Sequence, residues 1–115
     1  MSFLSRLMNR PDDASMSPAD FVADRDAAAP VLDVRTPAEF AEGHLADAAN
    51  VDVMAQNFPQ QIEAMDLPES GPIYLYCRSG NRSGQATKIL RQMGYEGAVN
   101  VGGFDALARA GAETA

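Results

Sequence analysis

The segment YLYCRSGNRSG carries the single cysteine of the chain, Cys77, where an apolar run gives way to small, polar and basic residues. A thiolate is a strong nucleophile, and three features here favour the ionised form of Cys77. A strand expected before Cys77 and a helix expected from Ser83 place the thiol at the positive end of the helix. Gly80 permits the backbone to turn its N–H groups inward, and Arg78 and Arg82 add positive charge. The segment therefore predicts a reactive thiolate.

Other interpretations of Cys77 are weaker. Most free cysteines are small buried hydrophobic residues, but a packed thiol needs neither two arginines nor two glycines within the next seven residues. One cysteine cannot form an internal disulfide, and one histidine, His44, leaves no Cys/His cluster for zinc or an iron–sulfur centre. Neither GxxxxGK[ST] nor GxGxxG occurs, so no nucleotide loop is expected. We expect no cofactor and no metal.

Length and composition predict one globular domain. The chain has 115 residues, of which 46% are hydrophobic, and a formal net charge of −7. That charge argues against binding to nucleic acid or to an anionic membrane surface, because both need a basic face. No apolar run reaches the roughly 18 residues of a membrane span, and the first residues lack the apolar core of a secretory signal, so a cytoplasmic location is expected. Residues 1–16 are predicted to be an N-terminal extension, either a short amphipathic helix or a loosely docked terminus, and residues 17–115 the folded domain.

Hydrophobic patterns and capping signals predict alternating strands and helices. Ser17-Pro18 and Thr36-Pro37 are typical helix starts, and Glu39 has the spacing of a capping box. Strands are expected over residues 30–34, 50–53, 73–77 and 98–101, and helices over 17–25, 36–43, 58–67, 83–93 and 104–110. This order predicts an α/β fold with parallel strands and helices on both faces of the sheet. Cys77 would then lie at the carboxyl end of a strand, where such sheets bind ligands.

Several motifs together resemble the single-domain rhodaneses, a family of sulfurtransferases. They are LDVR at residues 32–35, Glu39, GHL at 43–45 followed by Ala48 and Asn50, the cysteine loop, and VGGF at 101–104. The likeness runs from about residue 17 to the C-terminus. It implies a rhodanese-like, mostly parallel five-stranded sheet with helices on both faces, and a cysteine that carries sulfane sulfur as a persulfide.

The resemblance assigns roles to particular residues. Cys77 would accept and donate the sulfur, and Asp33 and Arg35 would support the loop without taking part in the chemistry. The substrate-binding residues that it implies are Arg78, Ser79, Gly80, Asn81, Arg82 and Ser83, with backbone amides of residues 78–82 around the persulfide. The expected partners are a small anionic sulfur donor such as thiosulfate and an acceptor that is cyanide, a thiol or a protein.

Two other functions stay open at the level of sequence. Cysteine-dependent phosphatases and arsenate reductases also use a cysteine-to-arginine loop, and the phosphatase signature places five residues between cysteine and arginine. Here four residues separate Cys77 from Arg82, which predicts a smaller cradle, suited to one sulfur atom. The other alternative is a rhodanese-like module that binds a partner, or senses oxidants through Cys77, without turnover.

Overall fold

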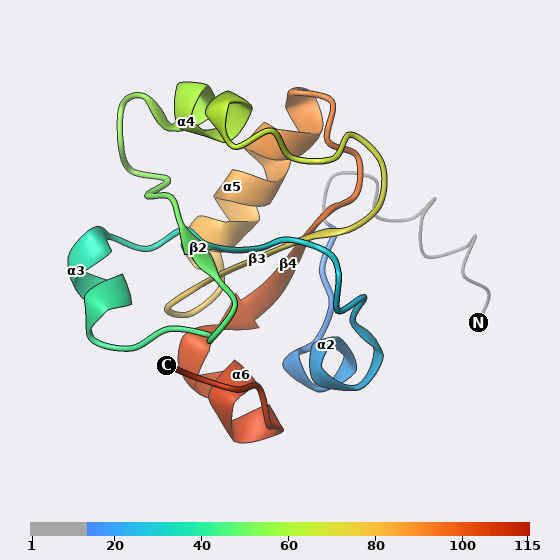
Figure 1. Cartoon of the computed structure of the whole chain (residues 1–115), viewed down its shortest axis with the longest axis vertical. Coiled ribbons are helices and arrows are strands. Elements are labelled where there is room, and N and C mark those ends of the chain that lie inside the picture. The colour runs from blue at the N-terminus through green and yellow to red at the C-terminus, as the bar shows by residue number, and fades with distance from the viewer. Residues whose placement is uncertain (1–13) are drawn as a thin grey trace.

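The computed structural model describes residues 14–115, which form one parallel sheet with helices on both faces (Figure 1). The strands are β1 (Val31–Asp33), β2 (Ala49–Asn50), β3 (Ile73–Cys77) and β4 (Ala98–Gly103). They lie in the order β2-β1-β3-β4, and every neighbouring pair is parallel. The carboxyl ends of all four strands therefore meet at one edge of the sheet, which confirms the predicted α/β class.

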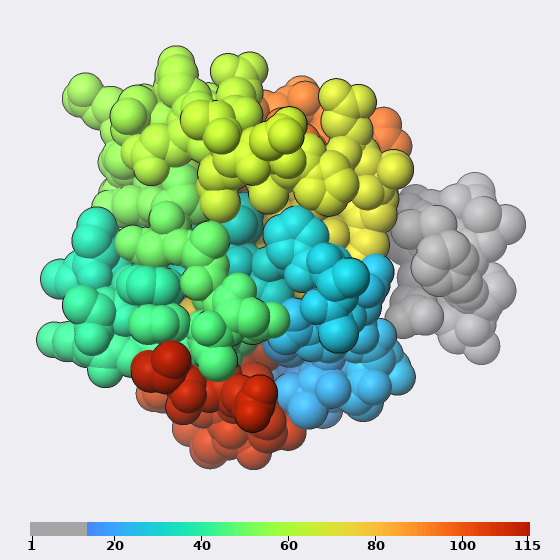
Figure 2. Space-filling view, viewed as in Figure 1, coloured from blue at the N-terminus to red at the C-terminus, as the bar shows by residue number. Residues whose placement is uncertain are grey.

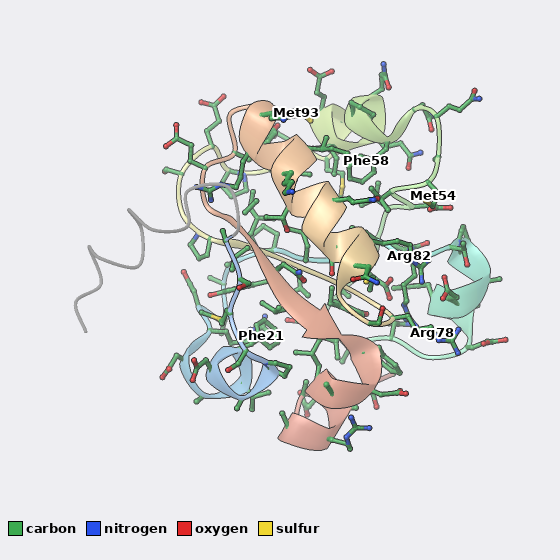
Figure 3. All side chains as sticks on the ribbon, turned by 180° about the vertical axis from the view of Figure 1, so that it is seen from behind. Phe21, Met54, Phe58, Arg78, Arg82 and Met93 are labelled. Atoms are coloured by element: carbon green, nitrogen blue, oxygen red, sulfur yellow. The ribbon has the colours of Figure 1, made fainter. Side chains whose placement is uncertain are left out.

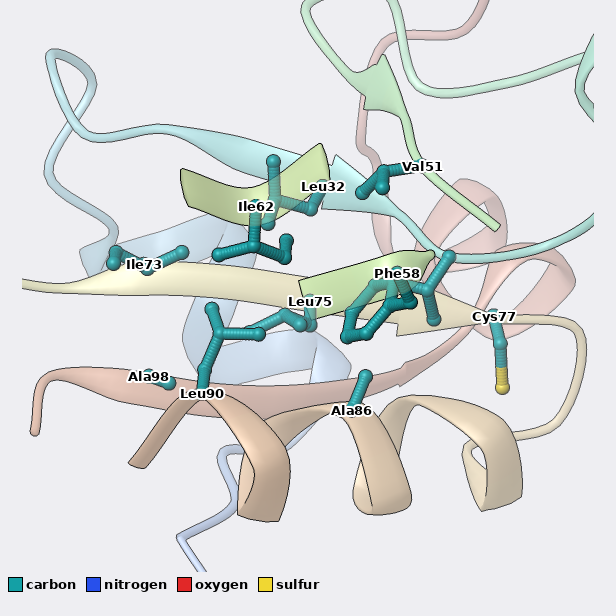
Figure 4. Close-up of a cluster of buried hydrophobic side chains, with 11 residues drawn as sticks. Leu32, Val51, Phe58, Ile62, Ile73, Leu75, Cys77, Ala86, Leu90 and Ala98 are labelled. Atoms are coloured by element: carbon teal, nitrogen blue, oxygen red, sulfur yellow. The ribbon is translucent and has the colours of Figure 1, made fainter. Parts of the chain in front are cut away.

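The central strand β3 divides its side chains between two hydrophobic clusters. Ile73, Leu75 and Cys77 belong to the cluster under α4 (Phe58–Ala64) and α5 (Asn81–Gln92), which Figure 4 shows. Tyr74 and Tyr76 point to the other face, where α2 (Pro18–Asp24) and α6 (Phe104–Ala110) cover the sheet. This alternation follows from the two-residue period of a strand, and it places the Cys77 side chain on the α5 face.

The cap signals in the sequence are confirmed. Ser17 accepts a hydrogen bond from the amide of Asp20 at 3.1 Å and begins α2. Thr36 and Glu39 form a reciprocal capping box at the start of α3 (Pro37–Ala41). After α3 the chain packs against its own C-terminus, where Ala46 N–H donates to the Glu113 carbonyl at 2.9 Å (Figure 2).

The expected number of strands is wrong for the described residues, because residues 14–115 hold four strands and not five. A fifth position beside β4 is reduced to a single parallel bridge between Ser15 and Asn100. Met16 N–H donates to the Asn100 carbonyl at 2.9 Å, but the chain then turns into α2 at Pro18, whose ring nitrogen carries no hydrogen for the ladder. The helix that starts two residues after Met16 thus ends the pairing.

Several element boundaries also differ from the sequence-based expectation; the helix expected over residues 58–67, for instance, ends at Ala64. The strand expected over residues 50–53 occupies Ala49–Asn50, and the helix expected from Ser83 begins at Asn81. The expected amphipathic piece of residues 1–16 lies almost wholly outside the described residues and stays a prediction. In the part of the chain that is described, no helix is both long and apolar enough to cross a bilayer.

Candidate active site

Cys77 is the last residue of β3, and a loop of residues 78–80 joins it to α5. Its sulfur points toward the first turn of that helix (Figure 4). Between the two elements, Gly80 adopts a left-handed conformation with φ of 101° and forms the N-cap of α5. A side chain at this φ is strained, so glycine is the residue that permits the chain to reverse within three residues. The reversal aims the amides of the loop and of the first helical turn back at the sulfur.

The sulfur accepts hydrogen bonds from neutral donors. Gly80 N–H lies 3.0 Å from Cys77 Sγ, and the Ser83 hydroxyl lies 3.3 Å from it. Burial raises the pKa of the thiol, but the hydroxyl and amide of Ser83, with the amides of Gly80 and Ser79, outweigh burial. The pKa of Cys77 therefore lies below its ordinary value. The site can hold an anionic sulfur without a metal or a neighbouring base.

The Cys77 side chain is also deeply buried. The residue is only 1% exposed and packs in the same hydrophobic cluster as Leu75 and Ala86. Its burial differs from the accessible thiol that an oxidant sensor would require. Little of the Cys77 surface is therefore open to a reagent.

The two arginines of the loop differ in their surroundings. Arg82 donates two parallel hydrogen bonds to the Glu39 carboxylate, at 2.8 and 3.0 Å, whereas Arg78 is 78% exposed and lies 3.6 Å from the same carboxylate. Figure 3 shows both guanidinium-bearing residues at the end of α5 that faces α3. The hydrogen bonds from Arg82, reinforced by the Thr36 amide, lower the pKa of Glu39 to about 2. Glu39 thus stays ionised and neutralises one of the two positive charges at the loop.

Asp33, the last residue of β1, and Arg35 form a buried pair. Arg35 donates to both oxygens of Asp33 and also to the Gly43 carbonyl at 2.7 Å. The Tyr76 hydroxyl donates to Asp33 at 2.7 Å and accepts from the Leu45 amide at 2.9 Å. The pair thus joins β1, β3 and the segment after α3, on the sheet face opposite Cys77. Its hydrogen bonds hold the frame of the site and not the sulfur.

The remaining sequence-predicted residues fall in two groups. Gly80 and Ser83 donate the hydrogen bonds at 3.0 and 3.3 Å to the sulfur, and the Ser79 amide contributes to the lowered pKa of the thiol. Asn81 opens α5 with an exposed side chain. The amides that bond the thiolate come from residues 79, 80 and 83. The cradle of amides 78–82 around a persulfide stays a prediction.

Two residues of the site were missed as partners by sequence reasoning. Glu39 was noted for its capping box, but its contact with Arg82 spans 43 positions of the chain. Asn100, in β4, accepts from the Ser83 hydroxyl and donates to the Gly80 carbonyl. The signal for Asn100 was available as a polar amide inside the apolar run AVNV. Within residues 14–115, no three His, Cys, Asp or Glu side chains gather closely enough to hold a metal ion.

Known proteins are similar to this chain in sequence and in fold. The model of the rhodanese-like domain matches residues 17–110. A sulfurtransferase of Allochromatium vinosum is 40% identical over 82 residues, which cover 70% of this chain and 73% of that protein. Thiosulfate sulfurtransferase 16, chloroplastic, of Arabidopsis thaliana is 38% identical over 93 residues, with 72% and 77% of the two chains covered.

The fold agrees with these relatives. The crystal structure of a rhodanese-related protein from Thermoplasma volcanium matches with a TM-score of 0.74 at 27% identity, over 89% of this chain and 97% of that one. The family match also runs through every residue that contacts the Cys77 sulfur. On sequence and on structure alike, the chain belongs to the rhodanese-like domain family.

Proposed function

We propose that the protein is a thiosulfate sulfurtransferase that carries sulfane sulfur on Cys77 as a persulfide. Sulfur transfer as the general chemistry is supported by the family and by relatives of 38 and 40% identity that are named sulfurtransferases. The observation that carries the assignment to Cys77 is the set of neutral donors aimed at its sulfur, from Ser79, Gly80 and Ser83. Such donors stabilise an anion on the terminal sulfur of a persulfide as they stabilise the thiolate.

The reaction has two displacements. The Cys77 thiolate attacks the outer sulfur of thiosulfate, the S–S bond of the donor breaks, and sulfite leaves with the bonding electron pair. The enzyme then carries an anionic persulfide. In the second step a nucleophilic acceptor, cyanide or a thiolate, attacks the outer sulfur of the persulfide, and the Cys77 thiolate leaves. No oxidant or reductant is consumed, and the free enzyme is regenerated after each cycle, as in ping-pong catalysis.

The surroundings of the loop suit an anionic donor with a narrow reacting end. Arg78 offers a mostly exposed positive charge 3.6 Å from Glu39, whereas Arg82 is held closely by Glu39. Local charge of this kind attracts an anion although the whole chain carries a net charge of −7. Because Cys77 is buried, a single terminal sulfur can reach it more easily than a tetrahedral phosphate surrounded by oxygens.

The covalent intermediate provides the test. Intact-protein mass spectrometry after incubation with thiosulfate should show a gain of one sulfur atom, about 32 Da, that is lost on addition of cyanide. The Cys77→Ser variant should show no gain, and a Ser5→Ala variant, outside the domain, should load normally. Hydrolysis of a phenyl phosphate ester without any sulfur loading would overturn the proposal in favour of a phosphatase. If the protein neither loads sulfur nor hydrolyses the phosphate ester, the proposal is overturned in favour of a binding module without turnover.

A further inference from the structure

Asn100 lies beside the cysteine loop because of an irregularity in β4. Up to Asn100, β4 pairs regularly with β3, with Ala98 opposite Ile73 and Asn100 opposite Leu75. The register then shifts, and Gly102 pairs with Tyr76 at a left-handed φ of 103°. The Asn100 side chain shares the α5 face with Ala98, two residues earlier, and the bulge turns the Gly102 amide back onto it at 3.0 Å.

The carboxamide of Asn100 has three hydrogen bonds, and two of them reach the groups that contact the sulfur. Its Oδ1 accepts from the Ser83 hydroxyl at 2.7 Å and from Gly102 N–H at 3.0 Å. Its Nδ2 donates to the carbonyl of Gly80 at 3.0 Å. Gly80 N–H and the Ser83 hydroxyl are the two donors within hydrogen-bond distance of Cys77 Sγ. One side chain is thus bonded to both residues whose donors meet the sulfur.

We propose that Asn100 is a positioning residue for the sulfur chemistry of Cys77, and that it acts by fixing the Ser83 hydroxyl and the Gly80 peptide against the sulfur. The proposal deepens the proposed sulfurtransferase function and rests on it for its meaning in catalysis. The hydrogen bonds of the Asn100 side chain go to Ser83, Gly80 and Gly102 and not to the sulfur, so its effect on Cys77 passes through Ser83 and Gly80.

The Ser83 hydroxyl lies between two acceptors, Asn100 Oδ1 at 2.7 Å and Cys77 Sγ at 3.3 Å. A hydroxyl has one proton to donate, and an anionic sulfur attracts that proton more strongly than a neutral amide oxygen does. The contact with Asn100 therefore keeps the Ser83 oxygen beside the sulfur, ready to donate to the thiolate. Without Asn100 the Ser83 side chain can turn away, and the thiolate loses a donor.

The test is the titration of Cys77, measured by the rate of iodoacetamide alkylation against pH. The chain has one cysteine, so mass spectrometry reads the rate at a single site. The charged groups around the loop are Arg78, Arg82 and Glu39. The pKa of Glu39 is lowered to about 2 and that of Arg82 is raised, so this ion pair keeps its charges over about pH 5 to 10 and the profile reports the thiol. Asn100→Ala should raise the alkylation midpoint of Cys77 by about one pH unit, which corresponds to the loss of roughly one hydrogen bond to the thiolate.

A double-mutant cycle separates positioning from a general structural role. The shift caused by Asn100→Ala should fall by more than half in a Ser83→Ala background, since Asn100 acts partly through the Ser83 hydroxyl. An equal shift in both backgrounds, or no shift in a folded Asn100→Ala protein, would overturn the proposal.

The isosteric Asn100→Asp variant covers the case in which Asn100→Ala does not fold. It keeps Oδ1 but turns an oxygen toward the Gly80 carbonyl, so it should raise the midpoint further; an unchanged midpoint would refute the role. Alkylation does not depend on sulfur transfer, so a wild-type protein that fails to load sulfur would overturn the proposed function and leave this measurement intact.

Discussion

Replacing Glu39 by glutamine tests how charge is arranged at the cysteine loop. The glutamine has nearly the same shape and can still accept a hydrogen bond from the Thr36 amide, so the capping box is partly kept. The change removes the negative charge that neutralises Arg82 and attracts Arg78. The loop then presents two uncompensated guanidinium groups where the wild type presents one.

The size of the effect follows from Coulomb's law. At a separation of about 6 Å and an effective dielectric constant of about 40 to 80, one unit charge changes the energy of an approaching unit anion by about 1 kcal/mol. This corresponds to about a fivefold change in rate or affinity. A dianionic donor such as thiosulfate should gain more, so its KM should fall by at least that factor. Loss of the bidentate ion pair should lower the free energy of unfolding by about 1 kcal/mol.

The assay compares two alkylating reagents of similar size on the same thiol. Iodoacetate is an anion and iodoacetamide is neutral, and both attack the same thiolate, so the ratio of their rates cancels the thiolate fraction. In Glu39→Gln this ratio should rise about fivefold at low ionic strength and return toward the wild-type value in about 0.5 M salt. The matched control is Glu42→Gln. It removes the same charge from an exposed residue at the C-terminal end of α3.

The reasoning would be refuted by a ratio that does not change in Glu39→Gln, or by an equal rise in Glu42→Gln. The first outcome would mean that the arginines do not act on an approaching anion. The second would mean that only the net charge of the protein matters, and not the position of Glu39.

Three further predictions concern stability and the shape of the loop. Tyr76→Phe should lower the free energy of unfolding in urea by about 2 kcal/mol, because it removes one buried hydrogen bond of Asp33 and leaves the Leu45 amide without its partner; Tyr74→Phe, whose hydroxyl accepts one part-buried amide, should cost less. Glu39 has its pKa lowered to about 2 from an ordinary 4.5, so its stabilising contribution is present above about pH 4.5 and is lost as the pH falls toward 2; the urea midpoint should therefore fall less on acidification in Glu39→Gln than in wild type. Gly103→Ala would place a methyl group 2.3 Å from the Arg78 carbonyl, so the cysteine loop must move, and the alkylation midpoint of Cys77 should rise toward that of an ordinary thiol; an unchanged midpoint would show that the loop adjusts without losing its donors.

Local signals in the sequence predict the elements of the fold well. The apolar run IYLYC forms β3 over the expected residues, and the caps at Ser17 and Thr36 start α2 and α3. These features depend on neighbouring residues alone, through hydrogen bonds and side-chain alternation over a few positions. The start of α5 was placed two residues late because its N-cap is Gly80, whose backbone conformation and not a capping side chain ends the loop.

Features that depend on distant partners were harder to predict. The reactive cysteine and its small neighbours stand together in the sequence, so the centre of the candidate site could be identified. The contact between Glu39 and Arg82, and the bonds of Asn100 to the loop, join residues from different crossovers of the sheet. The fifth strand came from the family resemblance, and the described residues hold only the bridge at Ser15 in its place. The type of a residue indicates which hydrogen bonds its side chain can form, but the fold determines which residue becomes the partner.

The geometry also separates two roles that the sequence had joined. Helix dipole, inward amides and arginines were all expected to favour the Cys77 thiolate. In the folded protein, the groups that outweigh burial and lower the pKa of Cys77 are the neutral hydrogen-bond donors of Ser79, Gly80 and Ser83. Arg82 is committed to Glu39, and the hydrogen bonds to Glu39 raise the pKa of Arg82 more than the charge of Cys77 does. Arg78 lies 3.6 Å from Glu39 with most of its side chain exposed.

This separation fits a reaction in which the sulfur stays anionic while its charge moves outward by one atom, from thiolate to persulfide. Fixed dipoles at short range can hold such an anion without forming a tight ion pair that would quench its reactivity. Exposed charge acts at longer range, on the approach of the donor, and is screened by salt. The alkylation midpoint of Cys77 should therefore change little between about 0.05 and 0.5 M salt, whereas the preference for an anionic reagent should decline. A midpoint that rises with salt as steeply as that preference falls would mean that the arginines, and not the amides, hold the thiolate.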